Sequence, residues 1–179
     1  MKKIKVIFLV FIAISMVVGC DESKNIVEQQ VANFFEGYKK RDASISELLV
    51  GGTETDNMKF EGISTYFAEE LKYEIKSCKK QDDNTYNVKV KVQTIDFEQL
   101  FLLSYQETIE GYGEEGISEH FMDEMEQNIK ENNWVIKEVT CNVVVRKIND
   151  TFKIQMDSSL ANALSGGMNE YLNSLQGGE

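Results

Sequence analysis

Residues 71–96 read LKYEIKSCKKQDDNTYNVKVKVQTID, and this stretch decides the fold class. Apolar and polar residues alternate over 71–76 and again over 86–93, and the sequence QDDN at 81–84 between them is typical of a turn. A period of two places the apolar side chains on one face of a strand and the lysine-rich polar ones on the other. The stretch therefore predicts an antiparallel β-hairpin with one buried face and one solvated face.

A second hairpin follows later in the chain. Trp134 opens an alternating segment that runs to Lys147, and the sequence INDT at 148–151 is typical of a turn. Residues 152–156 alternate again as a return strand. The two hairpins together predict an antiparallel sheet of about four strands.

Helical segments surround the hairpins, because apolar residues recur there at three- and four-residue steps. Ser23 or Asn25 is the expected N-cap of the first helix, and Asp96 that of the middle one. Helices packed on one face of an antiparallel sheet make an α+β domain, which we expect over residues 26–176. Three helices are predicted before the first hairpin, at 26–41, 44–49 and 63–70, with a loop at 53–61. Between the hairpins one helix begins at Asp96 and is interrupted at 111–116, and another covers 117–128. A last helix runs from a cap at 157–159 to Leu175, with a break at Gly166-Gly167.

The composition excludes several functions. The 179 residues include 30 acidic and 19 basic side chains, a net charge of −11, and form no basic stripe, so we expect no nucleic-acid partner. One His and two cysteines besides Cys20 are too few for a closed zinc site of four ligands. The sequence therefore predicts no metal and no cofactor.

Residues 1–20 read MKKIKVIFLVFIAISMVVGC and have the pattern of an export signal. Three lysines precede a run of 13 almost wholly apolar residues, which is too short for an ordinary membrane-spanning helix. The run ends in VVGC at 17–20, which resembles a bacterial lipobox. That resemblance implies cleavage between Gly19 and Cys20 and a diacylglyceryl group on the sulfur of Cys20. An uncleaved anchor or a buried N-terminal strand is the alternative.

We therefore predict a signal peptide at 1–19, the lipidated Cys20 with a short polar spacer at 20–25, and a location on the outer face of the bacterial cytoplasmic membrane. Without residues 1–19 the chain keeps 16 basic and 30 acidic side chains, a net charge of −14. The acidic body is then expected to stand away from an anionic leaflet and to be held by its lipid alone.

The order of elements and three local phrases resemble the small lipoproteins of Gram-positive bacteria that have a nuclear-transport-factor-2-like (cystatin-like) fold. The phrases are LKYEI at 71–75, VKVKVQTID at 88–96 and FKIQMDSSLANAL at 152–164. The resemblance covers roughly residues 25–175. It implies a curved sheet that wraps around helices as a cone, inside which a pocket can form. Members include enzymes, small-ligand binders and lipoproteins without an assigned role, so the resemblance does not choose a function.

Aromatic residues are the candidates for the lining of such a pocket. Tyr66, Tyr73, Phe97, Phe101 and Trp134 fall near the expected sheet and helix faces. Ordinary core packing is the alternative explanation and the more frequent one.

Candidate polar chemistry is sparse, and we expect no catalytic residue, because no nucleophile, metal or nucleotide motif occurs. His120 is the only imidazole and lies in an acidic stretch, where it is either a pH-sensitive element or, more simply, a solvated helix residue. Asp96 is a candidate pocket base, although its position before FEQLF favours an N-cap. Residues 96–131 hold 11 acidic side chains against one lysine. That imbalance predicts a solvated helix face, a docking surface for a basic partner, or weak cation binding.

Cys78 and Cys141 are the pair left for a disulfide, which an exported protein can form. Cys141 shares the apolar parity of Val143, whereas Cys78 has the polar parity of Lys76. We therefore expect Cys141 to be buried and Cys78 to lie on the solvated face or at a strand edge, unless a bulge turns it inward.

Together these observations favour a membrane-anchored, non-enzymatic binding or interaction module of the cell envelope. Its expected partners are the membrane, through the lipid on Cys20, and an envelope protein or small ligand of unknown identity. A binder of a small apolar ligand is the second hypothesis, and a pocket enzyme with an acid–base carboxylate is the third. A filled interior with an exposed apolar patch would favour the interaction module, and an enclosed apolar pocket the ligand binder.

Overall fold

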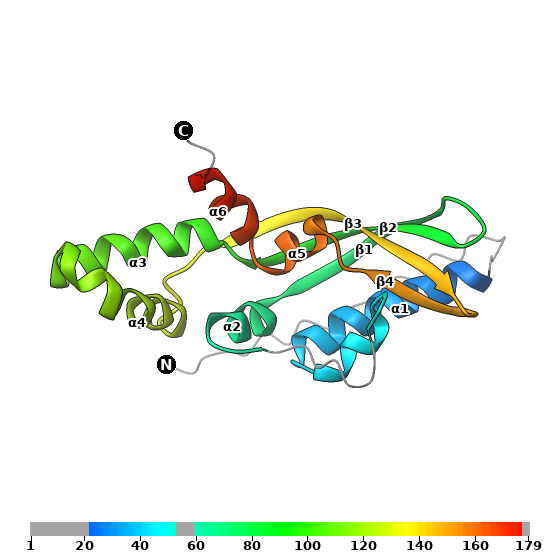
Figure 1. The fold of residues 1–179 in the computed structure, drawn as a ribbon, viewed down its shortest axis with the longest axis horizontal. Helices are drawn as coiled ribbons and strands as arrows, with labels where there is room; N and C mark the ends of the chain where they lie inside the picture. The colour runs from blue at the N-terminus through cyan, green and yellow to red at the C-terminus, as the bar shows by residue number, and fades with distance from the viewer. Residues whose placement is uncertain (1–21, 53–59, 177–179) are drawn as a thin grey trace, which may run out of the picture.

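The computed structural model describes residues 22–52 and 60–176, which form an elongated α+β fold (Figure 1). Residues 1–21, with Gly19 and Cys20, and most of the predicted loop at 53–61 lie outside the described residues. In chain order the elements are α1 (Glu22–Lys39), η1 (Ala43–Leu48), α2 (Ile63–Glu70), β1 (Lys72–Lys80), β2 (Thr85–Ile95), α3 (Phe97–Tyr112), η2 (Glu114–Gly116), α4 (Ile117–Lys130), β3 (Ile136–Ile148), β4 (Thr151–Gln155), α5 (Ser158–Leu164) and α6 (Met168–Gln176), where η marks a 3-10 helix.

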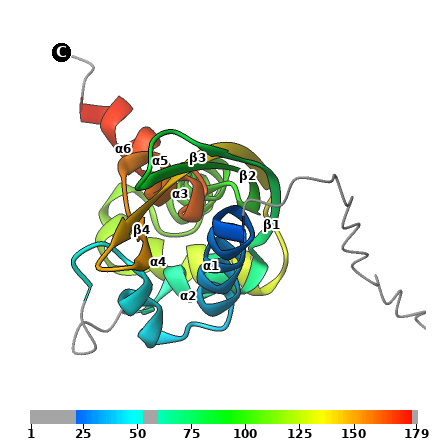
Figure 2. The ribbon, with the colours of Figure 1, turned by 90° about the vertical axis from the view of Figure 1, so that its right-hand side faces the viewer.

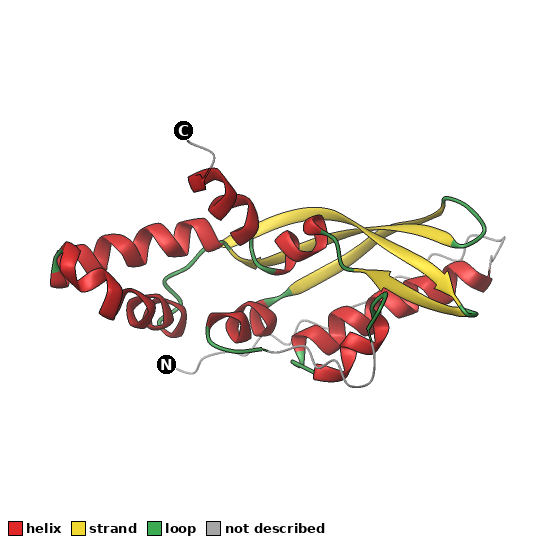
Figure 3. Ribbon diagram, in the orientation of Figure 1, coloured by secondary structure: helices red, strands yellow, loops and turns green. Residues whose placement is uncertain are grey.

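The four strands form one curved antiparallel sheet in the order β1-β2-β3-β4 (Figure 3). The two predicted hairpins are its outer pairs, and β2 and β3 join them along an unbroken register from Thr85 opposite Arg146 to Ile95 opposite Ile136. The predicted α+β class and antiparallel sheet are confirmed.

Strand β3 begins two residues later than predicted. Its pairing with β2 ends at Ile136, because the chain leaves the sheet at Asp96 to start α3 and no partner strand remains beyond Ile95. Trp134 therefore lies in the connection between α4 and β3 and does not open the strand.

Helix α1 lies in the concavity of the sheet, which curves around it (Figure 2). The helix begins at Glu22, so Ser23 and Asn25 lie within it and neither is its N-cap, and residues 22–25 of the predicted spacer are helical. Its apolar residues recur at three- and four-residue steps and pack against the inward-facing residues of β2, β3, β4 and α5. The buried residues of α1 are Val27, Val31, Phe34, Phe35 and Tyr38.

A β-bulge in β1 reverses the expected orientation of Cys78. Ile75 lies opposite Val90 and Ser77 opposite Lys89, so Lys76 is an extra residue on β1. The insertion shifts the alternation by one position and turns Cys78 inward, where it is 6% exposed. The expectation that Cys78 lies on the solvated face is wrong for this reason.

The register also separates the two cysteines. Cys78 lies opposite Val88 on one side of β2 and Cys141 lies opposite Val90 on the other, two positions further along. Two strand spacings of about 4.8 Å already exceed the Cα separation of about 7 Å that a disulfide tolerates. Both thiols are buried, and they form no disulfide within the described part of the chain. Burial raises the pKa of the Cys141 thiol to about 11.

Candidate functional site

A second apolar cluster lies beyond one end of the sheet, where α3 and α4 project as an antiparallel pair (Figure 1). It holds four of the five aromatic residues predicted to line a pocket: Tyr66, Phe97, Phe101 and Trp134. The fifth, Tyr73, lies in the main core, where its ring stacks on that of Phe35 at 4.8 Å between centroids. The structure therefore divides the predicted set between two cores.

Two hollows formed by the described residues lie on the outside of the molecule, and the predicted aromatic residues line neither. One hollow, of about 580 Å³, lies on the outer face of the sheet, and the other lies on α4 and the residue after it. Inside the second cluster, Ile95, Leu100 and Met125 are fully buried and fill the space between the helices and the sheet end.

Phe101 is the centre of an aromatic group on the outer side of the second cluster. Its ring centroid lies 4.9 Å from that of Phe121, 5.3 Å from that of Tyr171 and 6.2 Å from that of Tyr105, which stacks nearly parallel to it. Tyr105 is 39% exposed and the other three are half-buried. We call Phe101, Tyr105, Phe121 and Tyr171 the distal aromatic face, because Figure 1 shows α3 and α4 at the opposite end of the long axis from the start of α1.

Helix α6 extends this face toward solvent. None of its nine described residues is buried, although its apolar residues share one side of the helix. Leu175 follows Tyr171 by one turn and is 58% exposed, so the apolar stripe continues past the contact with Phe101.

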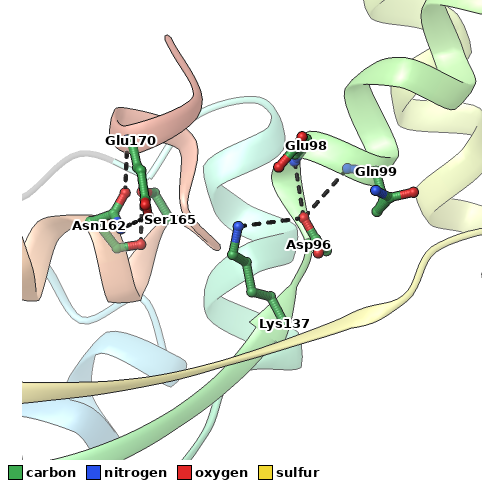
Figure 4. A network of polar contacts seen from close by, with 7 residues as sticks. All are labelled: Asp96, Glu98, Gln99, Lys137, Asn162, Ser165 and Glu170. Atoms are coloured by element: carbon green, nitrogen blue, oxygen red, sulfur yellow. Dashed lines mark hydrogen bonds and ion pairs between the residues drawn. The ribbon is translucent and has the colours of Figure 1, made fainter. Parts of the chain in front are cut away.

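A polar junction fixes α3 and α6 relative to the sheet (Figure 4). Asp96 is the predicted N-cap of α3, and its Oδ1 accepts hydrogen bonds from the backbone N–H groups of Glu98 (3.1 Å) and Gln99 (3.4 Å). The ammonium group of Lys137, on β3, lies 3.9 Å from the same oxygen. Asp96 thus holds the start of α3, as its position before FEQLF predicted.

The turn between α5 and α6 packs directly on this junction. Phe97 donates its backbone N–H to the carbonyl of Gly166 at 3.1 Å, and Asn162 exchanges hydrogen bonds with Glu170 across the turn. Gly166 has a φ of +61°, and a Cβ there would lie 1.8 Å from the carbonyl oxygen of Ile95. Glycine is required at this contact, which brings Tyr171 to Phe101.

Buried polar groups hold α3 against α4. The Asn128 amide donates to Ser104 Oγ at 3.2 Å and to the Glu107 carboxylate at 2.5 Å, and the Thr108 hydroxyl donates to the Ser104 carbonyl at 2.7 Å. The Thr108 bond lies within α3, whereas the two Asn128 bonds cross from α4 to α3 and form only when the two helices are in one register, so they specify that register. The helix pair is therefore a defined platform for the distal aromatic face.

The platform carries the acidic residues that the sequence placed there. The hollow on the outside of the pair is lined mainly by carboxylates and carries one lysine, which pairs with Glu126 at 3.1 Å. His120 lies near the tip of the pair and stacks on Tyr112, with 3.9 Å between the rings. Over residues 22–52 and 60–176 no group of three His, Cys, Asp or Glu side chains is arranged to hold a metal ion. The lining residues of the hollow are Asp123, Glu126, Gln127, Lys130 and Glu131.

The sequence predicts Phe101 as a site residue but not the three residues that surround it. Tyr105 is recoverable, because positions 97, 101 and 105 are spaced by four and share one side of a helix. Phe121 and Tyr171 come from other helices, and their contact with Phe101 has no local signal in the sequence.

No family model, curated protein or solved structure matches this chain. Among the residues that the structure describes, no helix combines the length and apolarity needed to cross a membrane.

Proposed function

We propose that the protein is a lipoprotein anchored through Cys20 on the outer face of a bacterial cytoplasmic membrane, and that its nuclear-transport-factor-2-like domain is a non-enzymatic interaction module of the cell envelope. The signal-like residues 1–19 and the lipobox-like VVGC sequence support the anchor. The distal aromatic face is the structural feature that supports the proposed role as an interaction module.

The position of α1 supports an orientation of this module. Glu22 follows Cys20 by two residues, which span at most about 7 Å. The start of α1 lies at one end of the long axis, and the pair of helices α3 and α4 projects at the other (Figure 1). A lipid on Cys20 would therefore hold the first end at the membrane and direct the helix pair, which carries three of the four residues of the distal aromatic face, away from it.

The chemistry of the face indicates its partner. Half-exposed aromatic residues on a rigid support are typical anchors of protein interfaces. The helices that carry them belong to the segment 96–131, with its 11 acidic side chains and one lysine. We infer a protein partner that presents apolar side chains flanked by Lys or Arg, because such a segment matches both the apolar centre and the acidic surroundings.

A photo-crosslinking experiment in living cells tests the interaction. The photoreactive residue p-benzoylphenylalanine replaces Tyr105 in the full chain, with Lys40, an exposed residue near the end of α1, as the control position. We expect a discrete adduct at position 105 that is absent at position 40 and is lost when Tyr171→Glu is added. Mass spectrometry of the adduct should place the crosslink in a basic amphipathic segment. The absence of an adduct, or the same adducts at both positions, would refute the proposed interface.

The anchor is tested separately by Cys20→Ser. We expect the variant to accumulate as an unprocessed precursor or to leave the membrane fraction. Normal processing together with normal membrane retention would show that the interpretation of residues 1–20 is wrong.

One observation favours a small apolar ligand as the second candidate. The indole Nε1 of Trp134 is buried without a hydrogen-bond partner among the described residues. An unpaired buried donor costs about 1–3 kcal/mol, which an acceptor atom of a ligand would offset. Native mass spectrometry of the full chain from its own host tests this candidate: a reproducible extra mass of small-molecule size supports it, and a bare chain contradicts it.

A further inference from the structure

The outer face of the sheet carries a hollow whose charge is opposite to that of the protein as a whole. Its lining comes from the outward-facing residues of β1, β2 and β3 and from the β1–β2 turn. Two of these residues are lysines, and none of the described lining residues is acidic. The lining residues are Ser77, Lys79, Gln81, Asn87, Lys89, Thr140 and Asn142.

The β-ladder brings the two lysines of this sheet hollow together. Lys79 on β1 lies opposite Asn87 on β2. Lys89 is two residues after Asn87 on β2, so Lys79 and Lys89 form a diagonal pair across the two strands. Cβ atoms in such a pair are about 7–8 Å apart, a distance that two long, flexible side chains can bridge to reach one anion. Both lysines are exposed, and neither forms an ion pair with a carboxylate of residues 22–52 or 60–176.

Two other lysines of the same face form ion pairs with carboxylates. Lys91 pairs with Glu138 at 2.7 Å, and Lys76 pairs with Glu74 at 2.5 Å. Lys79 and Lys89 therefore give the sheet hollow two positive charges with no ion-paired carboxylate among the described residues, in a chain whose net charge is −11. An oxyanion is the ligand class that this arrangement favours.

The remaining lining residues can recognise what is attached to the anion. Ser77, Thr140 and the three amides of Gln81, Asn87 and Asn142 are neutral groups that donate and accept hydrogen bonds. The hollow is open to solvent, and its volume of about 580 Å³ leaves room for a small molecule. We propose that the sheet hollow binds a phosphate ester of a hydroxyl-rich group, such as a polyol phosphate, with the two lysines on the phosphate and the amides and hydroxyls on the polyol.

Two sources can supply this chemistry: a soluble polyol phosphate or the headgroup of an anionic phospholipid. The β1–β2 turn lies at the same end of the long axis as the start of α1 (Figure 1), so a headgroup would be within reach of an anchored chain. The site itself does not depend on the anchor, because its lining residues lie entirely within the sheet and its turn.

The test uses the full chain in a zwitterionic detergent and measures binding by isothermal titration calorimetry. One arm titrates glycerol 1-phosphate, a second titrates inorganic phosphate, and a third adds phosphatidylglycerol in mixed micelles with the same detergent, with phosphatidylcholine mixed micelles as the neutral comparison. The variant Lys79→Ala/Lys89→Ala removes both positive charges from the lining of the sheet hollow. Lys40→Ala/Lys72→Ala is the matched control, because it removes the same charge from exposed lysines outside the hollow.

We expect saturable binding of glycerol 1-phosphate or phosphatidylglycerol by the wild-type chain and the control, weakened at least tenfold in Lys79→Ala/Lys89→Ala. Asn142→Asp, which adds a carboxylate to the hollow and keeps both lysines, should weaken binding to a similar extent. Binding of phosphatidylglycerol alone identifies the lipid headgroup as the source. Three results would each overturn the proposal. The first is no saturable binding of either glycerol 1-phosphate or phosphatidylglycerol, and the second is an equal loss of affinity in Lys79→Ala/Lys89→Ala and in the control double variant. The third is binding of inorganic phosphate as tight as that of glycerol 1-phosphate.

Discussion

The ring of Phe101 packs against the ring of Tyr171, with 5.3 Å between their centroids, and so connects α3 to α6. Together with the packing of Tyr171 on Phe97 (6.1 Å between ring centroids) and of Met168 on the same cluster, this contact attaches a helix that has no buried residue among residues 168–176. The distal aromatic face thus depends on a contact between segments that are 70 residues apart in the chain.

Phe101→Ala should lower the free energy of unfolding by about 2–3 kcal/mol, less than for a fully buried Phe because this ring is half-buried. Urea unfolding can be followed by the fluorescence of Trp134, the only Trp, which lies in the same cluster. The neighbouring, exposed Leu102 supplies the control, and Leu102→Ala should cost under about 0.5 kcal/mol. Similar losses in both variants would show that the Phe101 contacts contribute little.

Gly166→Ala should be among the most destabilising single-methyl changes in the chain. The added Cβ would lie 1.8 Å from the carbonyl oxygen of Ile95, and the φ of +61° is itself unfavourable for Ala. Gly51→Ala separates the two effects, because Gly51 has a φ of +78° with no atom within 4 Å. We expect a loss of about 1 kcal/mol at Gly51 from the backbone conformation and at least twice that at Gly166. Equal thermal unfolding midpoints for the two variants would contradict the close packing of the α5–α6 turn.

Substitutions at Asp96, the N-cap of α3, and at its ion-pair partner Lys137 should differ in their effect on the free energy of unfolding. Asp96→Ala should cost about 1–2 kcal/mol, because it removes the acceptor for two backbone N–H groups. Asp96→Asn keeps a hydrogen-bond acceptor and loses the charge, so it should cost under about 0.5 kcal/mol. Lys137→Met should also cost under about 0.5 kcal/mol, because the 3.9 Å ion pair with Asp96 is weak. Chemical unfolding of the three variants checks this order, and a larger loss for Lys137→Met than for Asp96→Ala would reverse the assigned importance of cap and ion pair.

Stability should fall at alkaline pH because of Cys141. Burial raises the pKa of its thiol from 9.0 to about 11, so between these values the folded chain holds a proton that the unfolded chain has released. Proton release therefore favours unfolding as the pH rises, by about 2 kcal/mol near pH 11. Cys141→Ala should flatten the decline between pH 9 and 11 in urea titrations. Tyr38→Phe should act only above pH 10, because burial raises the pKa of Tyr38 from 10.0 to about 12. An unchanged slope in Cys141→Ala would show that this thiol is not protected by burial.

Much of the fold could be predicted from local sequence patterns. The alternation on either side of QDDN at 81–84 marked both strands of the first hairpin, helix α2 spans the predicted residues 63–70, and Asp96 caps α3 as its position before FEQLF indicated. These features depend on contacts between residues a few positions apart, so their signals are present in the sequence. The candidate site was predicted only in part: Phe101 was found, but its neighbours on α4 and α6 were not.

The sequence by itself determined the helices, the hairpins, the N-caps Asp96 and Asp157 and the excess of acidic residues at 96–131, because each follows from periodicity, turn chemistry or composition. The tertiary structure alone decided which way Cys78 faces, because the extra residue at Lys76 is visible only in the pairing with β2. It alone decided that the aromatic residues predicted to line a pocket divide between two cores. It alone also placed Lys79 and Lys89 as a diagonal pair in a hollow whose described lining residues include no carboxylate. These outcomes depend on register and packing between distant segments, where a shift of one residue moves a side chain to the opposite face.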